Sequence, residues 1–131
     1  MCLSSIVMTD ATIPRIVSFA NGVAEITRSR PSSDRLLDGD PQHTARNLFS
    51  DATGQMFCGI WESSPGRWRV SYTENEFCHI TAGEVQIESE DGEVWTFSAG
   101  DSFVIPAGFA GTWNVPKALS KLYVIFEPAS S

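Results

Sequence analysis

The chain has 131 residues, of which 42% are hydrophobic and 19% are charged, and its formal net charge is −7. These proportions are typical of one globular domain and exclude a disordered chain. A negative charge repels phosphate backbones and anionic membranes, and no apolar run approaches the roughly 18 residues of a membrane span. We therefore expect no nucleic-acid partner and no membrane partner.

The N-terminus and the cysteines indicate the cellular compartment. Residues 1–10 lack the basic region and the apolar block of a signal peptide. The three cysteines, Cys2, Cys58 and Cys78, are an odd number and include no closely spaced metal-binding pair. We expect a cytoplasmic protein with reduced thiols, in which Cys58 and Cys78 act as small apolar side chains within strands.

Residues 1–50 are predicted to form an irregular N-terminal arm or connector. Within them, residues 27–47 carry four arginines among prolines, serines, aspartates and a glycine. Such a segment is rich in turns and has too few apolar residues for a core of its own. We expect it to lie over the surface, where it could reach a partner subunit, and we expect His43 to be a solvated loop residue.

Residues 51–131 are predicted to form a single barrel of short strands. Polar and apolar residues alternate between turn signals, and no segment has helical periodicity over three turns. Short strands at this spacing are typical of a β sandwich or barrel, so the predicted fold class is all-β. The expected strands are 55–62, 67–73, 76–81, 84–88, 94–97, 102–105, 112–115 and 121–127.

Two spaced motifs are more specific than this alternation. Glu76 is followed after six residues by Gly83, and Gly100 is followed at fixed spacing by Pro106 and Gly108. The pattern resembles the cupin family, whose double-stranded β-helix is a small jelly-roll barrel. Cupins commonly pair through an outer face, so the resemblance also implies a homodimer.

Shorter segments resemble one subgroup more closely, the one named for the cupin domain of (S)-ureidoglycine aminohydrolase. They are Gly59-Ile60-Trp61-Glu62, residues 65–70, Glu76-Phe77-Cys78-His79 and residues 106–113. This resemblance covers about two thirds of the chain. It implies an enzyme that releases ammonia from ureidoglycine in purine breakdown with the help of a bound metal.

The histidines that hold the metal in cupins are replaced here. The family motif G-x5-H-x-H-x(3,4)-E-x6-G places two of them before the glutamate, and a third follows the second motif. Counting back from Glu76 over four residues puts Arg69 and Ser71 at the paired positions, and Gly111 takes the third. A guanidinium carries a permanent charge and offers no lone pair to a metal. We therefore expect no metal and no cofactor.

Strand alternation predicts which side chains enter the barrel. If Glu76 points inward, Arg69 and Ser71 face it, whereas Trp68, Val70 and Tyr72 face outward. The predicted ligand-binding residues are Arg69, Ser71, Glu76, Cys78 and Trp113, with Glu76 as the candidate catalytic residue. Arg69 would hold a ligand carboxylate or ureido oxygen through two hydrogen bonds. Alternatively, Arg69 and Glu76 neutralise each other and fill the lumen.

The residues leave two functions open. The first is a metal-free barrel that binds a small polar or acidic metabolite. The second is the metal-dependent aminohydrolase reaction, although the full aminohydrolase resembles a two-barrel protein and this chain has room for one. A carbohydrate isomerase or epimerase would need a histidine base in the lumen, and neither His43 nor His79 is expected there. His79 is predicted to point outside, because neighbouring strand residues face opposite sides and Cys78 points inward.

Overall fold

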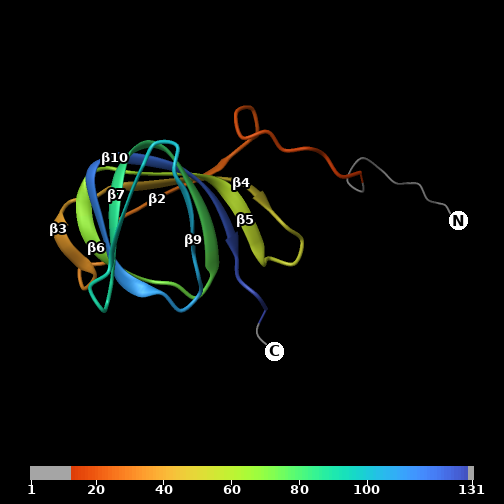
Figure 1. The fold of residues 1–131 in the computed structure, drawn as a ribbon. Helices are drawn as coiled ribbons and strands as arrows, with labels where there is room; N and C mark the ends of the chain where they lie inside the picture. The colour runs from red at the N-terminus through yellow and green to blue at the C-terminus, as the bar shows by residue number, and fades with distance from the viewer. Residues whose placement is uncertain (1–12, 130–131) are drawn as a thin grey trace, which may run out of the picture.

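The computed structural model describes residues 13–129, and the predictions for residues 1–10 and for the Cys2 thiol lie outside them. Within the described residues every regular element is a strand, and Figure 1 shows the strands curled into a barrel. None of residues 13–129 lies in a helix able to cross a membrane. The strands are β2 (Glu25–Ser29), β3 (Leu36–Gly39), β4 (His43–Ser50), β5 (Met56–Ser63), β6 (Gly66–Ser71), β7 (Asn75–Ser89), β8 (Val94–Ser98), β9 (Ser102–Ile105) and β10 (Ala110–Phe126).

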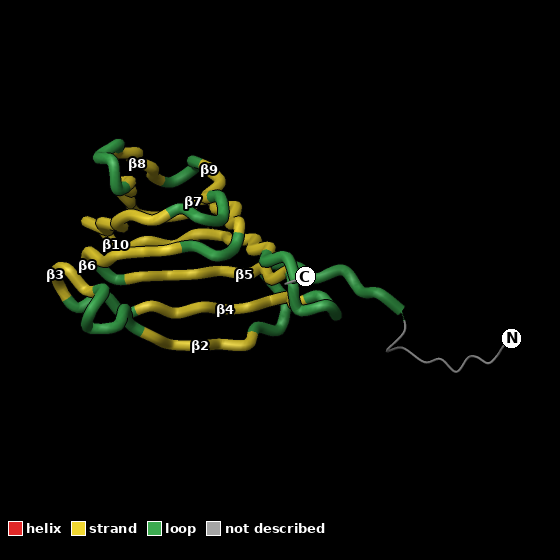
Figure 2. Tube along the Cα trace, turned by 90° about the horizontal axis from the view of Figure 1, so that it is seen from below, coloured by secondary structure: helices red, strands yellow, loops and turns green. Residues whose placement is uncertain are grey.

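The long strands β7 and β10 each contribute to both walls of the barrel. The first part of β7 pairs with β9 and its later part with β8, whereas β10 pairs first with β6 and then with β5. One wall runs β2-β4-β5-β10-β7-β9, and the other runs β3-β6-β10-β7-β8 (Figure 2). Two facing antiparallel walls built in this way form a jelly roll. The predicted all-β jelly roll is therefore confirmed.

Gly83 lies at the corner where β7 passes from one wall to the other. Its φ is +85°, and a Cβ there would lie 2.1 Å from the carbonyl oxygen of Ala118. The pairing of β7 with β10 shifts register at the same level, between Lys117 and Lys121. Both long strands thus change direction together, and only glycine fits the corner. The glycine that ends the first cupin motif has a structural role.

Residues 25–50 form strands, so the prediction of an irregular arm is wrong for this segment. β2 pairs with β4, β4 with β5 and β3 with β6, which extends both walls. The β2 side chains are all exposed and those of β3 nearly so, and the sequence there lacks inward hydrophobic alternation. Residues 13–24 form no strand and lead away from the barrel in Figure 1.

The hydrophobic core fills the space between the two walls. Its rings include Trp68 and Trp113, which stack with their centroids 6.1 Å apart, and Trp61, whose ring meets Trp113 edge-on. Burying a large apolar side chain contributes about 1.5–3 kcal/mol, so these tryptophans are a major part of the stability. The buried members are Trp68, Ile80, Val85, Ile87, Ile105, Trp113, Val115 and Leu119.

Candidate functional site

The two faces of β6 are the reverse of the predicted ones. Trp68 is buried, Val70 and Tyr72 are half-buried around the lumen, and Arg69 and Ser71 are exposed. The error arises at the turn after Ser71, where β6 ends, because strand alternation cannot be counted through a turn to Glu76. Arg69 therefore does not face Glu76, so it is not placed to hold a ligand inside the lumen, and Glu76 pairs with Lys121 in place of the predicted Arg69–Glu76 plug.

Lys121 is the cation that Glu76 meets. The Lys121 Nζ donates to the Glu76 Oε2 at 2.7 Å, and the two residues are only 4% and 5% exposed. Glu76 enters the lumen from the start of β7 and Lys121 from the middle of β10. A buried ion pair of this kind needs both partners, since either charge alone would be desolvated without compensation.

Lys121 is surrounded by a thiol and by aromatic rings. Its Nζ lies 3.6 Å from the Cys78 Sγ, 4.8 Å from the Trp61 ring centroid and 4.5 Å from that of Trp113. Burial by itself disfavours the ammonium ion, but Glu76 and Cys78 outweigh it, so the pKa of Lys121 lies above its ordinary value. The ring faces add attraction to the cation. Lys121 is thus held charged inside the barrel.

The thiol and phenol groups near this pair are held neutral. Cys78 points inward as predicted, and burial, opposed by Lys121 and assisted by Glu76, raises its pKa to about 12. Burial and then the charge of Glu76 also raise the pKa of Tyr72 well above its usual value. A thiol with this pKa is a poor nucleophile near neutral pH. Cys78 therefore contributes packing and a weak hydrogen bond to the site.

His43 is part of the interior, not a solvated loop residue as predicted. It begins β4, is half-buried, and its ring centroid lies 4.8 Å from that of Trp61 and 4.7 Å from that of Trp68. Burial, followed by the charge of Lys121, lowers the pKa of His43 to about 4. The imidazole is neutral at physiological pH. His79, by contrast, lies outside as predicted, with its Nδ1 2.7 Å from the Ser102 Oγ.

A small recess of about 90 Å³ opens beside the ion pair. Two buried side-chain nitrogens in this region, Trp113 Nε1 and His43 Nε2, have no hydrogen-bond partner among the described residues. Trp113 was predicted to face the lumen and does so, and it is 2% exposed. The walls of the recess are Trp61, Trp68, Val70, Tyr72, Trp113 and Lys121.

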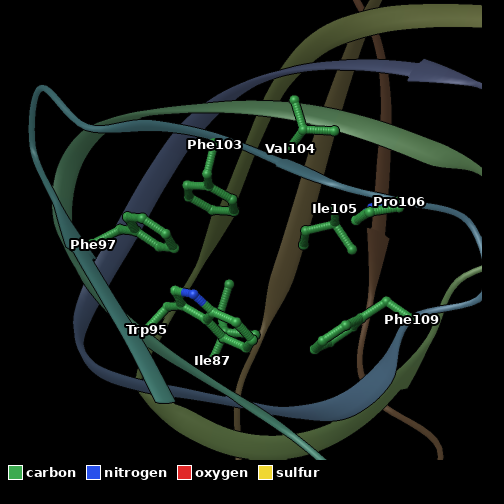
Figure 3. A pocket seen from close by; sticks show the side chains of 8 residues that line it. All are labelled: Ile87, Trp95, Phe97, Phe103, Val104, Ile105, Pro106 and Phe109. Atoms are coloured by element: carbon green, nitrogen blue, oxygen red, sulfur yellow. The ribbon is translucent and has the colours of Figure 1, made fainter. Parts of the chain in front are cut away.

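A larger recess of about 250 Å³ lies between β8 and β9 and is shown in Figure 3. The rings of Phe97 and Phe103 stack there with centroids 4.0 Å apart, and Trp95 meets Phe109 edge-on. Every lining residue is apolar or aromatic, so no charged group is placed to orient a ligand. The recess beside Lys121 is therefore the better candidate site. The lining of the larger recess is Ile87, Trp95, Phe97, Phe103, Val104, Ile105, Pro106 and Phe109.

The positions of the cupin metal ligands do not suit a metal. Counting back from Glu76 over three residues, which the family motif also allows, gives Val70 and Tyr72, and Gly111 pairs with Val70 across the strands. Valine and glycine side chains offer no ligand atom, and the Glu76 carboxylate is engaged by Lys121. No group of three or more histidine, cysteine, aspartate or glutamate side chains in residues 13–129 could hold a metal ion.

The sequence itself identifies the cupin branch. Residues 50–123 match the family of EutQ-like cupin domains, which is more than half of the chain. The chain belongs to the EutQ-like cupin family. The finer resemblance to the ureidoglycine aminohydrolase subgroup is not shown by this match. No curated protein matches the sequence.

Solved structures of other proteins share the fold of this chain. A protein of unknown function of the DUF861 family from Pseudomonas syringae superposes with a TM-score of 0.71 at 25% identity, over 79% of this chain and 45% of that one. This chain thus spans less than half the length of that protein. The Clostridium difficile EutQ protein gives a TM-score of 0.60 at 22% identity, over 76% of this chain and 80% of that one. A putative ethanolamine utilization protein Q from Salmonella typhimurium gives a TM-score of 0.60 at 17% identity, over 82% of this chain and 100% of that one. The last two likenesses concern the fold alone.

Proposed function

We propose that this EutQ-like cupin binds a small polar or acidic metabolite in the recess beside Lys121, without a metal. The observation that carries this proposal is the buried ammonium of Lys121 in a recess walled by Trp61, Trp68 and Trp113. An ammonium has three N–H donors, and the hydrogen bonds of the described residues use two of them, toward Glu76 and Cys78. The third is available to an oxygen atom of a ligand.

The unpartnered Nε1 of Trp113 supports the same ligand chemistry. A buried donor without an acceptor costs about 1–3 kcal/mol, and the indole N–H of Trp113 can only donate. A ligand with a carboxylate or carbonyl oxygen would offer acceptors to Lys121 and, after a small ring movement, to Trp113. The aromatic walls would cover its apolar part. A recess of about 90 Å³ suits a ligand of a few heavy atoms or the reacting end of a longer one.

Glu76 has a defined part in this proposal. Its carboxylate holds Lys121 charged and in place, so it positions the binding group. The candidate catalytic role of Glu76 stays a prediction. We do not propose the aminohydrolase reaction, because the family's metal-ligand positions carry Val70, Tyr72 and Gly111.

Tryptophan fluorescence can test ligand binding, since three tryptophans line the recess. We expect saturable changes on titration with acetate, glycolate or ureidoacetate at constant ionic strength. Trp113→Phe keeps an aromatic ring, although a smaller one, and removes the N–H, and it should weaken binding about tenfold. Trp95→Phe, which lies outside this recess, is the matched control. No saturable change with any probe, or equal weakening in both variants, would contradict the proposal.

We also propose that a second copy of the chain covers the outer face of the β5-β10-β7-β9 wall. Phe126 lies opposite Met56, and Phe77 lies between Val104 and Val124. Because Val124 and Phe126 share one face of β10, these side chains form a continuous apolar strip. Phe126, Met56, Phe77 and Val104 are 46%, 36%, 43% and 62% exposed in the single chain. Contiguous apolar surface of this kind is typical of an interface between subunits.

Light scattering after gel filtration tests the dimer. We expect the wild-type protein to be dimeric and Val104→Lys to be monomeric. Val94→Lys, at a similarly exposed valine on β8 of the opposite wall, should leave the dimer intact. A monomeric wild-type protein, or disruption by both variants alike, would refute this arrangement.

A further inference from the structure

Arg69 and Ser71, which point away from the lumen, help to line a polar recess on the outside of the barrel. This recess has a volume of about 420 Å³, which falls within the range of small-molecule sites. It lies over the β3-β6-β10-β7 wall, on the opposite side of β6 from the candidate site. Its lining is Arg35, Arg67, Arg69, Val70, Ser71, Glu88, Ser89, Glu90, Ala110, Gly111 and Thr112.

Three guanidinium groups are gathered there by the strand pairing. Arg67 and Arg69 are two residues apart on β6, so both project from its outer face. Arg35 is held beside them, because its carbonyl oxygen accepts a hydrogen bond from the Arg69 backbone N–H at 2.9 Å. Three of the nine basic residues of an acidic chain therefore share one recess.

Two carboxylates lie near these guanidinium groups, since the charge of Arg35 acts on Asp34 and Asp38 lies opposite Arg67 across the strands. None of the three arginines of the recess, however, takes part in an ion pair with another described residue. Three like charges held close together repel one another, so a bound anion would relieve this repulsion. The planar fork of arginine is well suited to phosphate and carboxylate oxygens.

The far side of the recess has the opposite polarity. Thr112 lies opposite Arg69 on one side and opposite Glu88 on the other, so the three side chains form a row across the outer face. Glu88 and Glu90 are exposed and line the recess. Carboxylates accept hydrogen bonds from hydroxyl groups but repel a second anion. The row therefore favours a ligand that is anionic at one end and rich in hydroxyl groups at the other.

We infer that this outer recess binds a phosphorylated polyol or sugar, with the phosphate group at Arg35, Arg67 and Arg69 and the hydroxyl groups toward Glu88 and Glu90. The hydroxyl of Thr112 lies between the two ends and that of Ser71 also lines the recess, and both can donate to the phosphate. This site is separate from the lumen site and does not depend on it.

Nuclear magnetic resonance titrations of the full chain test this site with inorganic phosphate, glucose 6-phosphate and glucose as probes, at constant ionic strength. We expect saturable shifts at the amides of residues 67–71 and 110–112, with glucose 6-phosphate binding more tightly than phosphate and glucose not binding. Arg69→Gln should weaken glucose 6-phosphate binding about tenfold, since it removes a charge-assisted hydrogen bond. Arg28→Gln, an equal charge change at exposed β2, should not weaken it.

Further variants define the outcomes. Glu88→Gln should weaken glucose 6-phosphate binding and leave inorganic phosphate binding unchanged or slightly stronger, whereas Glu25→Gln, the same change at exposed β2, should change neither. Shifts that sodium chloride reproduces, equal weakening by Arg69→Gln and Arg28→Gln, or tighter binding of malate than of glucose 6-phosphate would each overturn the assignment.

Discussion

The charges near the two faces of strand β6 differ in their exposure to water and in whether they are paired. On the inner face, Trp68 packs against the rings that enclose the Lys121–Glu76 pair, where each charge is desolvated and satisfied by the other. On the outer face, Arg67 and Arg69 keep their charges in water and have no ion-pair partner among the described residues. The inner charges are therefore part of the fold, whereas the outer ones are free to serve a ligand. The same residue types should respond very differently to substitution on the two sides.

The largest expected effect comes from breaking the buried pair. Lys121→Met leaves the Glu76 carboxylate buried without a counter-ion, and Glu76→Gln leaves the ammonium of Lys121 buried without one. Each should lower the free energy of unfolding by about 3–5 kcal/mol, as measured by urea denaturation at pH 7.

The double variant Glu76→Leu with Lys121→Met is the control for this comparison. It removes both charges and keeps an apolar interior, so it should recover most of the lost stability. A loss below about 1 kcal/mol in either single variant would mean that the pair is solvated, contrary to its burial.

The barrel could be predicted from the sequence because its signals are local. Turn residues and alternation indicate the strands from β5 onward, and Gly83 marks a corner where no side chain fits. Glu76, Cys78 and Trp113 were correctly expected to face the lumen. β2 and β3 were missed because their exposed side chains leave no hydrophobic pattern, so only their pairing with neighbours defines them.

The composition of the candidate site was harder to predict, since it depends on how separate strands meet. Which side chains of β6 point into the barrel depends on whether three or four residues intervene between the second ligand position of the motif and Glu76. The turn after β6 decides this, and strand alternation does not encode the geometry of a turn. Lys121 was missed because a lysine in a strand is usually exposed. Its neighbours Leu119 and Tyr123 do share the inner face, so the alternation along β10 already contained the signal.

His43, a titratable residue on the inner side of the barrel, should make the stability depend on pH. His43 packs against Trp61 and Trp68, and its folded pKa of about 4 lies below its ordinary value of 6.5. The unfolded chain therefore binds the proton more readily, so stability rises with pH between these values and falls as pH drops below about 6.5. Because the ring is only half-buried, we expect a discounted loss of about 1 kcal/mol between pH 7 and pH 5.

Urea denaturation of the wild type and of His43→Gln at both pH values measures this contribution. The variant should lose less stability on acidification than the wild type does, by about that amount. His79→Gln is the matched control, since His79 lies on the outer face beside Ser102. Identical pH dependence in the wild type and in His43→Gln would show that the imidazole is solvated in the folded protein.

The smallest expected effect belongs to the outer face of β6. Arg69→Gln removes an exposed charge that has no ion pair among the described residues, and it relieves repulsion from Arg35 and Arg67. Its free energy of unfolding should stay within about 0.5 kcal/mol of the wild type in the absence of ligand. Trp68→Ala, one position away on the inner face, should cost about 3–5 kcal/mol by the same measurement. Adjacent residues of one strand would then differ roughly tenfold in their effect on stability, because only one of them is removed from water. A cost for Arg69→Gln close to that for Trp68→Ala would mean that the guanidinium is a structural element of the barrel, and the distinction between the two faces would fail.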